Sequence, residues 1–116
     1  MAYEPIPTDL YETSLKKFLN TYLKSKSDVE ALVKDIKKNP RQRGTPIPSF
    51  KGLLWKARGA MKAYNIGKSG GIRLIYYFDG DALYLIFLYC KRQMANPPQE
   101  DLRKWLKANK FITDEP

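Results

Sequence analysis

Cationic side chains surround the most apolar stretch of the chain. Residues 70–92 contain two apolar runs separated by a turn at 79–81, and Arg73 is the lone charge within the first run. A charge in the middle of a strand is costly to bury unless it is paired. Arg73 therefore predicts either a hidden carboxylate or a face of the sheet that binds anions. Lys91 and Arg92, which follow the second run, favour anion binding.

A second pair of cations precedes this stretch. Lys56 and Arg58 alternate on a predicted strand at 53–58, so they share one face of it with Leu54. The chain contains no histidine, which excludes serine triads, ribonuclease mechanisms with two histidines and zinc hydrolase motifs. The segment 67–70 resembles only the end of a phosphate-binding loop, and a strand follows it instead of a helix, so nucleotide binding is not predicted.

Lysine and arginine alone can support cleavage of RNA, because the 2′-hydroxyl is an internal nucleophile beside the scissile phosphate. Arginine binds a phosphate through two hydrogen bonds and stabilises the transition state, and a lysine whose pKa is lowered by neighbouring cations can act as the base. The acid that protonates the leaving oxygen is not assigned. Four tyrosines on the predicted strands are available as this acid: Tyr76, Tyr77, Tyr84 and Tyr89. The alternative for each is a packing role, because aromatic residues on strands are usually packing residues.

The hairpin at 71–78 and 82–90 predicts which cations meet. With a two-residue turn and a regular ladder, Arg73 lies opposite an even-numbered residue and shares a face with Arg92. Lys91 then points the other way, unless the strand ends before it. A one-residue bulge would reverse this assignment. We therefore expect Arg73 and Arg92 to converge on condition that the ladder is regular.

Apolar spacing and capping residues predict the elements that hold these side chains. We expect a possible edge strand in the first residues, a helix from Thr8-Asp9, a second helix with a capping box at Ser27-Asp28-Val29-Glu30, a loop at 40–52, the strand at 53–58, a loop at 59–69, the hairpin, and a helix opening at Asn96-Pro97-Pro98-Gln99. This order predicts one α+β domain over 1–116. A small antiparallel sheet packs on an N-terminal helical hairpin, with a C-terminal helix whose apolar face includes Trp105 and Leu106.

Charge and composition point to an anionic partner and a cytoplasmic protein. Lysine and arginine number 21 against 12 acidic residues, for a net charge of +9, which favours nucleic acid or an acidic protein, although lysine-rich surfaces also serve solubility. The one cysteine, Cys90, lies in an apolar strand, and there is neither a signal pattern nor an apolar run long enough to span a membrane. The basic loop residues expected to bind RNA are Arg43, Lys51, Lys62 and Lys68.

Three segments resemble the RelE/ParE toxin superfamily, most closely a RelE/HigB-like toxin. In chain order they are Leu54-Trp55-Lys56-Ala57-Arg58, the stretch from Lys68-Ser69-Gly70-Gly71 through Ile72-Arg73-Leu74-Ile75-Tyr76-Tyr77, and Tyr89-Cys90-Lys91-Arg92. A glycine-bounded loop separates the first two. The similarity extends from the helical hairpin to the last helix.

The resemblance implies a toxin of a type II toxin–antitoxin system. Such a toxin is a small basic ribonuclease that enters the ribosomal A site, cuts mRNA without a metal or cofactor, and is silenced by an antitoxin. By position, Lys56 and Arg58 match the basic pair that orients the substrate or acts as base. Arg73 matches the phosphate-binding arginine, and Lys91 and Arg92 match the pair after the last strand.

Pro98 departs from the pattern, because some members place a tyrosine near this position. The antitoxin of so basic a protein should be acidic, with an amphipathic segment that docks between sheet and helices. Trp105 and Leu106 are candidates for that contact, with core packing of the last helix as the alternative. Two other functions stay open: a ParE-like inhibitor of DNA gyrase, and a non-catalytic basic module that binds RNA or an acidic protein.

Overall fold

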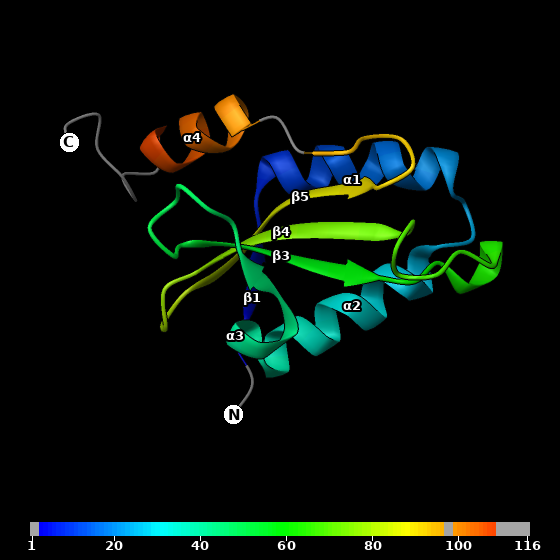
Figure 1. Ribbon diagram of the computed structural model, residues 1–116, viewed down its shortest axis with the longest axis horizontal. Helices are drawn as coiled ribbons and strands as arrows, with labels where there is room; N and C mark the ends of the chain where they lie inside the picture. The colour runs from blue at the N-terminus through cyan, green and yellow to red at the C-terminus, as the bar shows by residue number, and fades with distance from the viewer. Residues whose placement is uncertain (1–2, 97–98, 109–116) are drawn as a thin grey trace.

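A five-stranded sheet with helices on both faces forms the computed structural model, which describes residues 3–96 and 99–108 (Figure 1). In chain order the elements are β1 (Pro5–Pro7), α1 (Asp9–Thr21), α2 (Lys26–Lys38), α3 (Pro40–Arg43), β2 (Thr45–Pro46), β3 (Leu54–Gly59), the 3-10 helix η1 (Lys62–Tyr64), β4 (Ile72–Phe78), β5 (Leu83–Cys90) and α4 (Gln99–Ala108). Within the described residues, no helix is long and apolar enough to cross a membrane.

The strands lie in the order β1-β5-β4-β3-β2, and the two central pairs are antiparallel as predicted. The structure contains the predicted edge strand, β1, but it pairs with β5 in parallel, so the sheet is mixed rather than purely antiparallel. Pro5 and Pro7 each lack a backbone N–H, which suits them to an edge. The α+β architecture follows the predicted order of elements.

Two apolar clusters divide the core between the faces of the sheet. The first cluster packs Leu74 and Tyr76 of β4 against Phe18 of α1 and Leu32 and Ile36 of α2. Both helices therefore cover the same side of the strands, and Figure 1 shows α1 along β5 and α2 along β3. We call this side the hairpin face.

The second cluster lies on the opposite side, which we call the α4 face. Ile75 and Tyr77 of β4 pack there with Leu102 and Leu106 of α4 and with Phe50 from the loop before β3. The expected apolar side of the last helix is therefore confirmed: Leu106 is fully buried and Trp105 is half-buried.

Local signals set most of the element ends. The Thr8 side chain caps α1 by accepting a hydrogen bond from the Tyr11 N–H at 3.1 Å. The predicted capping box at Ser27 is wrong, because α2 begins at Lys26 with Ser25 as its N-cap. The predicted loop at 40–52 also holds more structure than expected, since Pro40 opens the short helix α3, and β2 follows it.

A one-residue bulge interrupts the pairing of β4 with β5. Tyr76 pairs with Leu85, but the next residue back along β4, Ile75, pairs with Phe87, so Ile86 is the extra residue. The N–H of Leu88 donates to the Ser14 hydroxyl of α1 at 2.9 Å. The bulge changes which side chains of β5 face α4, and that change decides the composition of the site.

Candidate active site

The ladder between β3 and β4 brings the predicted cations together. Arg58 lies directly opposite Arg73, and Lys56 lies opposite Ile75. Residues opposite each other in an antiparallel pair share a face. Ile75 belongs to the second cluster, so all three cations lie on the α4 face. The prediction that Lys56 and Arg58 share a face is confirmed.

Arg73 is almost fully buried, with 3% of its surface exposed. Its guanidinium donates to three backbone carbonyl groups: Lys68 O at 2.6 Å, Ser69 O at 3.1 Å and Ile72 O at 3.2 Å. Within the described residues it has no carboxylate at ion-pair distance. The sequence predicted that a hidden acid or an anion-binding face compensates the buried charge of Arg73. The structure adds a third means, a loop whose carbonyl groups hold the guanidinium in place.

Lys56 is a member of this group whose pKa is lowered by its surroundings. Burial lowers its pKa from the ordinary value of 10.5, and three neighbouring charges lower it further, in the order Lys91, Arg73, Arg58. A like charge nearby disfavours the protonated form. A lowered pKa is the property that a lysine needs in order to act as a general base.

Lys91, and not Arg92, completes the group. After the bulge, Arg73 pairs with Tyr89 instead of an even-numbered residue, so the expected convergence of Arg73 and Arg92 is wrong. Alternation carries Lys91 to the α4 face, where its charge lowers the pKa of Lys56. Arg92 turns to the hairpin face, where it lies against Gly70. There a hydrogen bond with Cys90 and burial raise the pKa of Tyr22, and the charge of Arg92 opposes that rise. We call Lys56, Arg58, Arg73 and Lys91 the cationic cluster.

The four loop residues expected to bind RNA fall at different distances from this cluster. Lys68 belongs to the loop whose carbonyl groups hold Arg73, and Lys62 lies on η1 in the same β3–β4 connection. The Arg43 guanidinium donates a hydrogen bond to the Arg58 carbonyl oxygen, and its Nε lies 3.6 Å from the Asp35 carboxylate.

Lys51 lies beyond the opposite end of β3. The strand alone separates Leu54 from Arg58 by about 13 Å. The structure thus places Lys62, Lys68 and Arg43 near one end of the sheet and leaves Lys51 at the other.

Tyr89 is a site residue that the sequence did not single out. It is the ladder partner of Arg73, it is 5% exposed, and its hydroxyl has no hydrogen-bond partner among the described residues. Burial raises the pKa of Tyr89, and the charge of Arg73 offsets part of this rise. The signal that could have identified Tyr89 is the bulge, since without it this side chain faces the helical hairpin.

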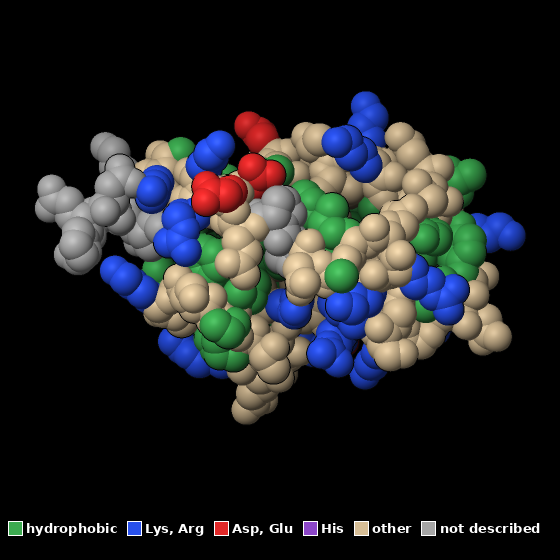
Figure 2. Space-filling model, turned by 45° about the horizontal axis from the view of Figure 1, so that its top comes forward, with side chains coloured by type: hydrophobic (Ala, Val, Ile, Leu, Met, Phe, Trp, Pro, Cys, Tyr) green, Lys and Arg blue, Asp and Glu red, His purple; other side chains and the backbone are tan. Residues whose placement is uncertain are grey.

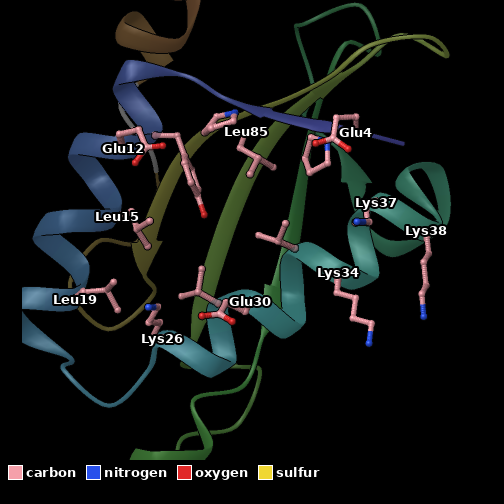
Figure 3. A pocket seen from close by; sticks show the side chains of 15 residues that line it. Glu4, Glu12, Leu15, Leu19, Lys26, Glu30, Lys34, Lys37, Lys38 and Leu85 are labelled. Carbon is pink, nitrogen blue, oxygen red and sulfur yellow. The ribbon is translucent and has the colours of Figure 1, made fainter. Parts of the chain in front are cut away.

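A hollow of about 530 Å³ lies on the other side of the sheet, between β1, α1 and α2. Figure 3 shows Leu15 and Leu19 of α1 at one side and Lys34, Lys37 and Lys38 of α2 toward the far end. It contains no member of the cationic cluster. Its apolar walls suit an apolar or amphipathic segment rather than a phosphate.

Comparison with known proteins relates this architecture to solved structures. No family model and no curated protein matches the chain. The chain is similar to a chain in the crystal structure of the toxin–antitoxin complex RelBE2 from Mycobacterium tuberculosis, with 19% sequence identity and a TM-score of 0.54. The alignment covers 78% of this chain and 99% of that one. The chain therefore has a RelE-like fold, as its sequence predicts.

Proposed function

We propose that this protein is the toxin of a type II toxin–antitoxin system and that it cleaves mRNA in the ribosomal A site. The observation that carries the proposal is the cationic cluster. Four like charges on one face repel each other, and within the described residues no carboxylate lies at ion-pair distance from any of them. Such an arrangement is stabilised by a bound anion, and the RelE-like fold favours a phosphate of RNA as that anion.

Each cationic side chain has a role in this reaction. Lys56, with its lowered pKa, removes the proton of the 2′-hydroxyl. The 2′-oxygen attacks phosphorus, and the bond from phosphorus to the 5′-oxygen of the next nucleotide breaks. Arg58 and Lys91 bind the phosphate oxygens, on which negative charge grows in the transition state. Arg73 contributes positive charge from its buried position and fixes the loop at 67–71. The products are a 2′,3′-cyclic phosphate and a 5′-hydroxyl.

An acidic antitoxin is the partner that this surface suits. Basic side chains are spread over most of the face in Figure 2, whereas its few acidic side chains gather in the upper left part. The hollow between β1, α1 and α2 is the groove of sheet and helices that an amphipathic segment would enter, with acidic residues beside Lys34, Lys37 and Lys38. Leu106 is fully buried and Trp105 packs on Tyr84, so core packing is the better account of the last helix.

Expression with and without changes in the cationic cluster tests the function. We expect wild-type protein to arrest growth and to cut mRNA in a translating extract. The double variant Lys56→Ala/Arg58→Ala should do neither. The matched control is Lys16→Ala, which removes an exposed cation of α1.

The result also separates the alternative functions. Inhibition of gyrase supercoiling without mRNA cleavage would assign the protein to the ParE branch. RNA binding without cleavage or arrest would make it a basic binding module. Cleavage that survives in the double variant would refute the cationic cluster as the active site.

A further inference from the structure

The proposed reaction needs an acid to protonate the leaving 5′-oxygen, and the cationic cluster does not supply one. Its two arginines stay protonated in proteins. Lys56 is assigned to the base, and Lys91 donates to the Ala95 carbonyl oxygen at 2.9 Å. The chain has no histidine, so a phenol is the neutral acid left to consider.

Hydrogen bonding distinguishes the tyrosines of the hairpin. The Tyr76 hydroxyl donates to the Pro40 carbonyl oxygen, on the side of the sheet away from the cluster. The Tyr77 hydroxyl donates to Asp79 at 2.8 Å. Tyr84 pairs with Tyr77 near the turn, at the end of the sheet far from Arg73. Tyr89 alone among these four lies beside the cluster.

The Tyr89 hydroxyl is buried and has no hydrogen-bond partner among the described residues. Leaving a buried polar group without a partner is costly, and phenylalanine would pack the same ring without that cost. The unpaired hydroxyl is therefore expected to have a partner in another state of the protein. Tyr89 lies opposite Arg73 in the ladder, so a phosphate bound at the cationic cluster could accept the hydrogen bond of this hydroxyl.

We propose that Tyr89 is the general acid of the proposed cleavage reaction, donating its phenolic proton to the 5′-oxygen as the bond from phosphorus to that oxygen breaks. This assignment rests on the proposed function. The phenolate then recovers a proton from water. Burial, which raises the pKa of Tyr89, keeps the phenol protonated before the reaction.

The turn after β5 packs against the apolar cluster that contains Tyr89. The N–H groups of Gln93 and Met94 donate to the Cys90 carbonyl oxygen at 3.0 and 3.1 Å, and Met94 packs in the same apolar cluster as Tyr89. The bond from Lys91 to Ala95 ties this turn.

The test compares Tyr89→Phe with wild type on two RNAs. Purified protein is added to ribosomes carrying a short mRNA in the A site, after the wild-type cut has been mapped. One RNA has the ordinary 5′-oxygen at the cut, and the other has sulfur in its place, which leaves without needing a proton. We expect Tyr89→Phe to cut the ordinary RNA about a hundredfold more slowly or worse, and the sulfur RNA at nearly the wild-type rate. Tyr84→Phe, the control, should match wild type on both.

Stability gives a second readout that a structural hydroxyl would not produce. Because the Tyr89 hydroxyl has no hydrogen-bond partner among the described residues, Tyr89→Phe should unfold in urea at the same or a higher concentration than wild type. An equal loss of rate on both RNAs, a wild-type rate on the ordinary RNA, or an earlier unfolding midpoint would each overturn the assignment. Wild-type protein that cuts neither RNA would overturn the proposed function, and the assignment with it.

Discussion

Replacing Arg73 should affect stability as well as activity, and the structure gives the size of the stability effect. Arg73→Met keeps the stem of the side chain but removes three hydrogen bonds. The bonds to Lys68 O and Ser69 O are partly buried, so water can replace them in part, and Ile72 O lies on β4 opposite Gly59 of β3, where the ladder supplies another donor. Losing these bonds to the buried guanidinium should cost about 1–3 kcal/mol. Loss of the buried charge opposite Arg58 offsets part of it.

Urea and thermal unfolding of Arg73→Met and Arg58→Met measure this difference. Arg58 is exposed, so its replacement should change the free energy of unfolding by no more than about 0.5 kcal/mol. Arg73→Met should melt about 4–12 °C below wild type, and both variants should lose cleavage. Equal stability of the two variants would refute the view that the guanidinium holds the loop. Normal cleavage by a folded Arg58→Met would refute the role of Arg58 on phosphate.

Three further results are expected. The cleavage rate should rise with pH and level off below the ordinary lysine pKa of 10.5, because the pKa of Lys56 is lowered, and Lys91→Met should move that plateau to higher pH by removing a neighbouring charge. Gly71→Ala should lower the melting temperature, because its Cβ would collide with the Gly59 carbonyl oxygen, whereas Gly67→Ala meets open space and should not. Lys56→Ala should reduce the salt dependence of RNA binding by about 0.7 in log–log slope; an unchanged slope would remove Lys56 from the RNA interface.

The fold follows from sequence to the extent that each element carries its own signal. The Thr8 cap, the apolar stripes of α1 and α2, and the turn at 79–81 predict helices and strands that the structure contains. The Asp79 carboxylate accepts from the N–H groups of Asp81 and Ala82, each at 2.9 Å, which explains why this turn was recognisable. The parallel pairing of β1 was not predictable, because a three-residue strand between prolines has no pattern that sets its direction.

Three cations of the site could be identified from the sequence because they lie on strands whose alternation is regular. Lys56, Arg58 and Arg73 are joined by an uninterrupted ladder, so parity places them correctly. The choice between Lys91 and Arg92 depended instead on β5, where the ladder is irregular. The carbonyl groups around Arg73 come from a loop, and no rule of spacing predicts such contacts.

The physical reason for the bulge is visible in how it sorts the side chains of β5. On the hairpin face it places Leu83, Leu85 and Leu88, and on the α4 face it places Phe87 and Tyr89. A regular ladder would send both rings toward α1, where the first cluster is already closely packed, and inserting larger side chains into a packed core is destabilising. Because both faces of β5 are apolar, hydrophobic alternation alone does not show which of its side chains face α4.

The same one-residue shift determines the chemistry beyond it. Every side chain after Ile86 changes face, so Tyr89 and Lys91 lie on the α4 face and Arg92 lies on the hairpin face. The positions of the proposed acid and of the fourth cation thus both follow from the bulge. Variants of Tyr89 and Lys91 should therefore impair cleavage, whereas Arg92→Ala should leave the chemical step unchanged. If Arg92→Ala abolished cleavage in a protein of normal stability while Lys91→Ala did not, the bulge would not describe the active protein.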